Sequence, residues 1–208
     1  MASLVLLFVG SVLLVNGLVF LGRVEARLAA PINILTGLAL TATVLFIVLP
    51  VRDTGTESLN AVIGAVGFLL FSFTYITVGF NDIFDLEGYA LGWYCGWATL
   101  IAIFLSAANF ARIDDARFGW LWLSWSVLFF AFFLALVTNM AWIAKPVGIL
   151  TVLQSFTTCT VPAALMLTEQ WSGLSLVFIA VVQLAVIVIF VERAVAARRR
   201  SRQFGAVS

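Results

Sequence analysis

The residue types that usually carry out covalent or metal chemistry are scarce in this sequence. Its 208 residues include no histidine and only two cysteines, Cys95 and Cys159. Histidine is the most frequent general base and a common metal ligand, and two cysteines are too few for a disulfide framework or a thiolate metal site. We therefore expect neither an enzyme nor a site for a metal or cofactor.

The side chains left for recognising a ligand are neutral amides, hydroxyls and aromatic rings. One helical face, with intervals of four, three, four, three and four residues, carries Phe118, Trp122, Trp125, Phe129, Phe132 and Leu136. A second face with helical spacing carries Leu6, Val9, Leu13 and Asn16. By periodicity alone, packing against neighbouring helices or lipid is the preferred interpretation of the aromatic face. The alternative is that it lines a narrow path.

The elements that hold these side chains are predicted to be membrane helices. Hydrophobic residues make up 63% of the chain and charged residues 10%, with a mean hydropathy of +1.16. A soluble protein is roughly 45–50% apolar and about 25% charged. The charged residues leave seven uncharged stretches, each long enough for one span of about 20 residues. These stretches are 1–22, 28–51, 58–81, 88–111, 118–144, 146–168 and 170–191.

The pattern predicts an all-α integral membrane protein with a bundle of seven transmembrane helices. We expect a six-helix channel core over residues 1–168, a seventh helix over 169–192 and a basic cytoplasmic tail over 193–208. With the N-terminus outside, eight Lys and Arg residues are cytoplasmic and three are external, which favours that orientation. The tail is expected to lie near anionic lipid, and a net charge of +1 offers no surface for nucleic acid.

Small residues and one proline add two predictions about the helices. Gly10 and Gly17, and the row Gly88, Gly92 and Gly96, predict close helix contacts.

Pro162 lies inside its stretch and is expected to kink it, which frees the carbonyl of Thr158. We consider a polar ladder formed by that carbonyl and the side chain of Gln154. The alternative is that threonine hydroxyls or a neighbouring helix satisfy the carbonyl.

Four stretches resemble the AmiS/UreI family of bacterial urea and short-chain amide channels. They are LVLLFVGSVLLVNG (4–17), LLFSFTYITVGFN (69–81), WLWLSWSVLF (120–129) and the Val-Pro pair that follows Gln154. The resemblance covers about residues 1–170. It implies protomers with external N-termini, each with its own pore, assembled as a homo-hexamer in the bacterial cytoplasmic (inner) membrane.

The resemblance also implies which side chains line the pore, with contributions from the first, third, fifth and sixth helices. Carried over by motif, the lining is Leu6, Val9, Leu13, Asn16, Phe73, Thr77, Phe118, Trp122, Trp125, Leu128, Phe129 and Gln154. Three positions are expected to differ from the acid-activated urea channel: Thr77 and Phe129 replace a Tyr and a Trp, and Gln154 replaces a Glu. This chain also lacks that channel's histidine-rich loop and adds a helix, so it is closer in kind to the amidase-associated AmiS channels.

Together, these observations predict a passive channel for urea or short-chain aliphatic amides that acid does not switch on. A dry aromatic pore admits a small neutral amide, whereas an unpaired ion faces a desolvation cost of tens of kcal/mol. We also expect a functional link to an amidase or urease. Two alternatives remain open: an ion-coupled secondary transporter, disfavoured because no charge lies deep in a span, and a non-transporting subunit or sensor. Acids between the spans, such as Asp82, Asp85 and Asp115, are most simply solvated loop residues.

Overall fold

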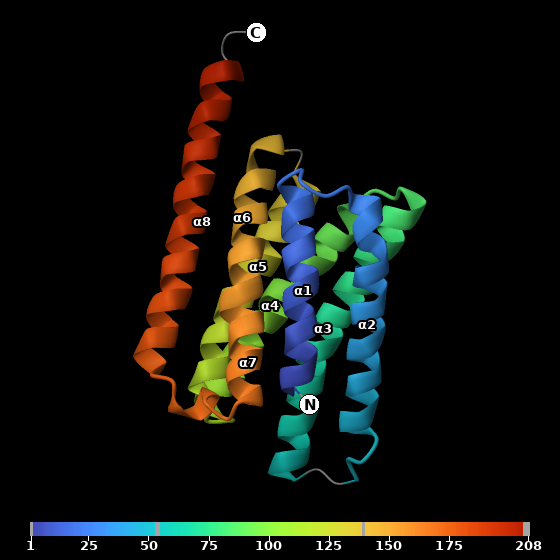
Figure 1. The fold of residues 1–208 in the computed structure, drawn as a ribbon, viewed down its shortest axis with the longest axis vertical. Coiled ribbons are helices and arrows are strands. Elements are labelled where there is room, and N and C mark those ends of the chain that lie inside the picture. The colour runs from blue at the N-terminus through green and yellow to red at the C-terminus, as the bar shows by residue number, and fades with distance from the viewer. Residues whose placement is uncertain (1, 53–54, 139, 206–208) are drawn as a thin grey trace.

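The computed structural model describes residues 2–52, 55–138 and 140–205, which form a bundle of long helices (Figure 1). The described residues contain no β-strand, and seven helical segments are long and apolar enough to cross a membrane. Six of these spans are single helices: α1 (Ala2–Phe20), α2 (Ala26–Val48), α3 (Thr56–Phe84), α4 (Tyr89–Ala111), α5 (Ala116–Val137) and α8 (Leu176–Gly205). The sixth span in chain order is composed of several shorter segments. The predicted all-α architecture with seven spans is confirmed.

The sixth span changes its hydrogen-bond pattern along its length. It consists of η1 (Ala141–Ile143), α6 (Ala144–Gln154), η2 (Ser155–Thr160) and α7 (Val161–Leu167). The segment η2 is a π-helix, in which hydrogen bonds reach five residues back, and the N–H of Val161 accordingly donates to the carbonyl of Phe156. Pro162, which has no N–H to donate, therefore lies at the start of α7, directly after this change of register.

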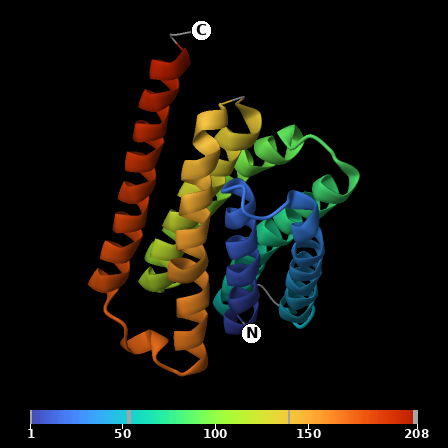
Figure 2. The ribbon, with the colours of Figure 1, turned by 45° about the horizontal axis from the view of Figure 1, so that its top comes forward.

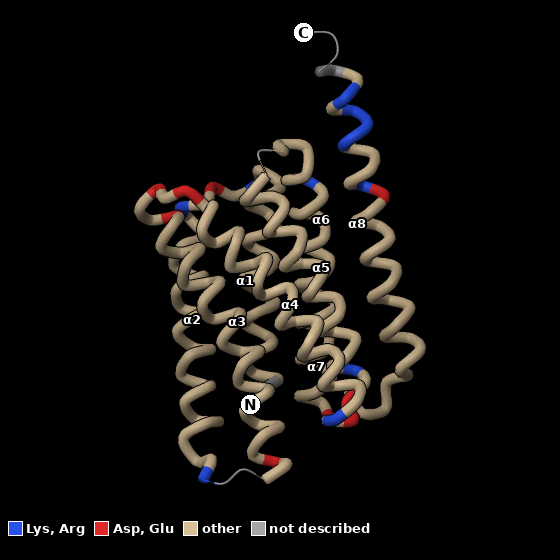
Figure 3. Tube along the Cα trace, turned by 180° about the vertical axis from the view of Figure 1, so that it is seen from behind, with Lys and Arg blue, Asp and Glu red and all other residues tan. Residues whose placement is uncertain are grey.

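The helix α8 packs against α5 and α6 at one side of the bundle and extends past them at its C-terminal end (Figures 1 and 2). A short helix, η3 (Trp171–Gly173), precedes it. Because α8 runs without interruption from Leu176 to Gly205, the predicted seventh span and most of the predicted basic tail form one helix. Residues 206–208 of that tail lie outside the described residues. The arginines of α8 gather at its far end (Figure 3).

Glycine rows set the distance between neighbouring helices, as predicted. On α4, Gly92 faces α5, where an added Cβ would lie 2.6 Å from Cγ2 of Val137. On α1, Gly17 faces α6, where an added Cβ would lie 2.6 Å from Cγ2 of Val152. Since carbon atoms at van der Waals contact are about 3.5–4.0 Å apart, neither position has room for a larger residue. These contacts hold α4 against α5 and α1 against the sixth span.

Candidate pore

Two cavities lie inside the bundle, and both are lined by α1, α3, α4 and α5. Cavity I measures about 200 Å³ and cavity II about 240 Å³. Each of the four helices lines cavity I with one half of its length and cavity II with the other half. On α1, for example, Val9 lines cavity I and Asn16 lines cavity II. On α5, Trp125 lines cavity I and Phe132 lines cavity II. The two cavities therefore follow one another along the bundle.

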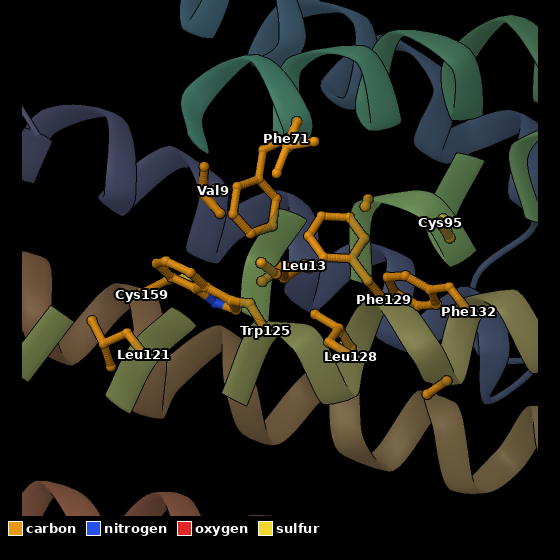
Figure 4. Packing of buried hydrophobic residues seen from close by; sticks show 14 of the residues in the cluster. Val9, Leu13, Phe71, Cys95, Leu121, Trp125, Leu128, Phe129, Phe132 and Cys159 are labelled. Atoms are coloured by element: carbon orange, nitrogen blue, oxygen red, sulfur yellow. The ribbon is translucent and has the colours of Figure 1, made fainter. Parts of the chain in front are cut away.

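An apolar contact, the aromatic constriction, separates the cavities and consists of Leu13, Phe71, Trp125 and Phe129. The ring centroid of Phe71 lies 5.1 Å from that of Trp125 and 5.3 Å from that of Phe129. All four side chains are buried, and they converge from α1, α3 and α5 (Figure 4). The space between the cavities is therefore closed by side chains that offer a ligand almost no hydrogen-bonding group.

Trp125 is held in place from behind, by the sixth span. Its Nε1 donates to the hydroxyl of Thr158 at 2.9 Å, and that hydroxyl donates to the carbonyl of Gln154 at 2.6 Å. The indole N–H is thus occupied inside the protein. The ring presents its apolar surface to Phe71 and to cavity I.

Both cavities carry polar groups at a distance from the constriction. The polar residues that line cavity I are Asn60, Asn109 and Asp115, and those that line cavity II include Asn16, Thr74, Asn81 and Asp82. Asn16 and Asn33 of α2 exchange two hydrogen bonds of 2.8 Å each. A primary amide has two N–H donors and two acceptor lone pairs, so the amide of Asn16 keeps one donor and one acceptor beyond this pair.

The hydroxyl of Tyr75 belongs to a residue that packs directly on the constriction. Its ring stacks on Phe71 with centroids 5.9 Å apart, and the residue is 1% exposed. The hydroxyl is buried and has no hydrogen-bond partner among the described residues. A buried hydroxyl without a partner is unfavourable for the fold, and because Tyr75 lines cavity II, this hydroxyl is available to a ligand there.

Comparison with known proteins places this architecture in a family. The sequence matches the family described as AmiS/UreI family transporter over residues 1–170. The chain belongs to the AmiS/UreI family. It is 38% identical to a Rhodococcus erythropolis protein assigned as transporter AmiS2, over 82% of this chain and 81% of that protein. It is 34% identical to a Mycolicibacterium smegmatis protein assigned as a transporter of amidate substrates, over 91% of this chain and 88% of that protein.

The same fold occurs in a solved structure. The cryo-electron microscopy structure of the Helicobacter pylori urea channel in its closed state superposes with a TM-score of 0.73 at 23% identity. The match covers 82% of this AmiS/UreI transporter and 100% of the urea channel. The predicted family is therefore confirmed, and the chain is more similar to the AmiS-type relatives than to the urea channel.

Eight of the twelve side chains expected at the pore lie along the two cavities and the constriction. Cavity I has Leu6, Val9, Phe118, Trp122 and Trp125, cavity II has Asn16, and Leu13 and Phe129 lie between the cavities. Leu128 is buried beside them and lines neither cavity.

The positions expected on α3 are two residues out of register. Phe73 is 51% exposed on the outer surface, and Thr77 lines neither cavity. Phe71 and Tyr75 line the cavities in their places, because residues two positions apart lie on nearly opposite faces of a helix. At the level where Thr77 was expected to line the pore, the structure has Tyr75 instead.

Gln154 also lies away from both cavities. Its side chain is fully buried, and its Nε2 donates to the carbonyl of Ser124 on α5 at 2.9 Å. Gln154 thus belongs to the contact between α5 and α6, and α4 supplies the fourth wall expected from the sixth helix. The proposed polar ladder is not part of a path through these cavities, because Gln154 and Thr158 line neither of them and Nε2 of Gln154 is bonded to α5.

A repeat on α3 could have located the lining that the sequence analysis missed. The face that lines the cavities carries Gly64, Phe68, Phe71, Tyr75, Val78 and Asp82, at intervals of four, three, four, three and four. This is the interval pattern that marked α5. By contrast, α4 shows no comparable signal, because its outward face is equally apolar and carries Trp93 and Trp97.

Two acids expected in solvated loops lie at the cavities instead. Asp82 belongs to the last turn of α3 and lines cavity II. Asp115 lines cavity I and caps α5, where its Oδ1 accepts a hydrogen bond of 3.1 Å from the N–H of Phe118. Both were assigned to loops because they lie between the uncharged stretches, whereas α3 extends past Asp82 and α5 starts directly after Asp115.

Proposed function

We propose that this protein is a passive channel for urea and short-chain aliphatic amides. The substrate would pass through cavity I, the aromatic constriction and cavity II. The observation that carries the proposal is a path between four helices that is polar at both ends and apolar in the middle. The Mycolicibacterium smegmatis relative assigned as a transporter of amidate substrates supports small amides as the substrate class, and urea has the same planar carboxamide chemistry.

The apolar middle selects for neutral solutes. Moving an amide out of water costs about 4–8 kcal/mol without compensation and roughly 0.5–2 kcal/mol with partial hydrogen bonding, whereas a bare ion costs tens of kcal/mol. At the constriction, Leu13, Phe71 and Phe129 provide no compensation, and the hydroxyl of Tyr75 is the partner that lowers the cost for an amide. An ion gains too little from one hydroxyl to cross.

At the polar ends, side-chain amides replace water around the substrate before and after it crosses the apolar constriction. A substrate amide needs a donor for its carbonyl and an acceptor for its NH₂ group, and carboxamides such as Asn109 in cavity I and Asn16 in cavity II offer both. The pairing with Asn33 fixes the orientation of Asn16 before the substrate arrives. Weak, multiple sites of this kind favour rapid release.

The distribution of charge supports an orientation in a bacterial cytoplasmic membrane. Lys and Arg gather at the end of the bundle that includes the C-terminal part of α8 (Figure 3), so that end is assigned to the cytoplasm. The N-terminus and cavity I then face outward. Assembly as a homo-hexamer and a functional link to an amidase or urease stay predictions from the resemblance, and native mass spectrometry of the purified protein tests the first.

One observation favours an ion-coupled transporter as a second candidate. Asp82 places a carboxylate at cavity II inside the span of α3, and ionisable groups in spans often carry coupling ions. A passive channel requires no gradient, so flux by Asp82→Asn should match that of the wild type. Loss of gradient-driven accumulation in this variant would favour the transporter.

Shrinking and swelling of proteoliposomes, followed by stopped-flow light scattering, tests the proposal. Formamide, acetamide, butyramide and urea are compared with and without proton and sodium gradients. The proposal expects a flux that does not saturate with solute concentration, is faster for the smaller amides and is unaffected by either gradient. Flux equal to that of protein-free liposomes, or uphill accumulation driven by a gradient, would contradict it.

A further inference from the structure

The amide of Gln183 is buried in the first part of helix α8, which is otherwise apolar from Leu176 to Val191. Gln183 is 2% exposed, and its Nε2 donates to the carbonyl of Thr157 at 3.2 Å. Burial of a polar side chain in an apolar environment is costly unless it is hydrogen-bonded. The family match ends at residue 170, before α8 begins, and no residue of α8 lines cavity I or cavity II.

The carbonyl that Gln183 contacts belongs to the π-helix η2. A π-helix is rare and usually occurs where tertiary contacts or function require it. Thr157 carries the bond to α8, and the next residue, Thr158, carries the bond to Nε1 of Trp125 in the constriction. One residue of η2 is thus held by α8, and its neighbour holds a ring of the pore.

The opposite side of η2 has no room to move. An added Cβ at Gly10 of α1 would lie 3.0 Å from the carbonyl oxygen of Ser155, so η2 packs closely on α1. The segment η2 is therefore held between α1 on one side and α8 on the other.

A second contact fixes the start of α8 to the entrance of cavity I. The guanidinium of Arg117 on α5 donates to the carbonyls of Ser172 at 2.7 Å and Leu174 at 3.1 Å. Phe118, the next residue, lines cavity I. The segment that leads into α8 is thus held by α5, and α8 itself is held to η2 through Gln183.

We propose that α8 positions Trp125 through η2, and that Gln183 is a positioning residue for size selection at the aromatic constriction. This inference rests on the proposed channel function. Removal of the Gln183 N–H loosens η2 and lets the ring of Trp125 move, so larger amides gain relative to smaller ones. A residue that only joins two helices would change the amount of folded protein and leave the ratio of rates unchanged.

The test compares the full-length wild type with Gln183→Met, which keeps the length of the side chain but removes its donors. Leu184→Met is the matched control, since Leu184 is the next residue, 48% exposed on the outer surface of α8. The measurement is the ratio of butyramide to acetamide flux in proteoliposomes. Loss of one hydrogen bond should raise the ratio about threefold or more in Gln183→Met, with no change in Leu184→Met.

Thr158→Val interrupts the same connection without a change in α8 and serves if Gln183→Met yields no folded protein. It should raise the ratio as Gln183→Met does. In a Trp125→Phe background, which lacks the indole N–H, Gln183→Met should have no further effect. An unchanged ratio in folded Gln183→Met, or in Thr158→Val, would overturn the inference. Absence of flux in the wild type would instead overturn the proposed function.

Discussion

Replacement of Tyr75 by phenylalanine should affect stability and substrate flux in opposite directions. The Tyr75 hydroxyl is buried without a partner among the described residues, and an unsatisfied group of this kind costs about 1–3 kcal/mol. Tyr75→Phe removes the hydroxyl and keeps the ring that stacks on Phe71. The free energy of unfolding should therefore stay the same or rise by up to this amount.

Flux should fall in the same variant, because the substrate loses its partner beside the constriction. A net hydrogen bond contributes about 0.5–1.5 kcal/mol, and each 1.4 kcal/mol is about tenfold in rate. Acetamide flux through Tyr75→Phe should accordingly be about two- to twelvefold slower than through the wild type. Stopped-flow light scattering measures the flux, and thermal unfolding of the purified protein measures the stability.

Tyr94→Phe is the matched control for this prediction. The Tyr94 hydroxyl donates to the carbonyl of Leu70 at 2.9 Å, and Tyr94 lines neither cavity. Its removal should lower stability by about 1 kcal/mol and leave flux unchanged. The reasoning is refuted if Tyr75→Phe conducts as fast as the wild type, or if it loses as much stability as Tyr94→Phe.

Three further predictions concern the constriction and pH. Leu13→Glu should stop flux at neutral pH, since an ionised group there is not solvated; measurable flux at equal protein amount would contradict this. Trp125→Ala should raise butyramide flux relative to acetamide, and an unchanged ratio would mean that Trp125 serves packing alone. Flux at pH 5 should stay within about tenfold of flux at pH 7.5, because the chain has no histidine; a larger rise would show acid activation.

The spans and the aromatic face of α5 were predictable because they depend on local patterns. Charged residues delimit the helices, and a repeat of three and four residues identifies one face without tertiary information. The α5 face does lie toward the interior, where Trp122, Trp125, Phe129 and Phe132 are all buried. The glycine rows were predictable for the same reason, since small residues in a span indicate a close neighbour.

The remaining features depend on how helices rotate about their own axes. A shift of two residues on α3 is a rotation of about 200°, which exchanges Phe73 for Phe71. A resemblance between apolar sequences does not fix such a rotation, whereas the repeat through Phe68, Phe71 and Tyr75 does.

The site of Gln154 depends on its tertiary partner, the carbonyl of Ser124. The π-helix η2 likewise depends on contacts with α1, α5 and α8. Neither leaves a signal in the local sequence.

Chemical modification of single cysteines tests the path itself most directly. In a background with Cys95→Ala and Cys159→Ala, one cysteine is introduced at Val9 in cavity I, at Val78 in cavity II or at Gln154 outside both. A thiol reagent is applied, its attachment is verified by mass spectrometry, and acetamide flux is measured.

The account predicts that modification of Val9→Cys and of Val78→Cys each blocks flux, and that reagent treatment of Gln154→Cys leaves it unchanged. Full flux through modified Val9→Cys or Val78→Cys, or a block confined to Gln154→Cys, would contradict a path between α1, α3, α4 and α5.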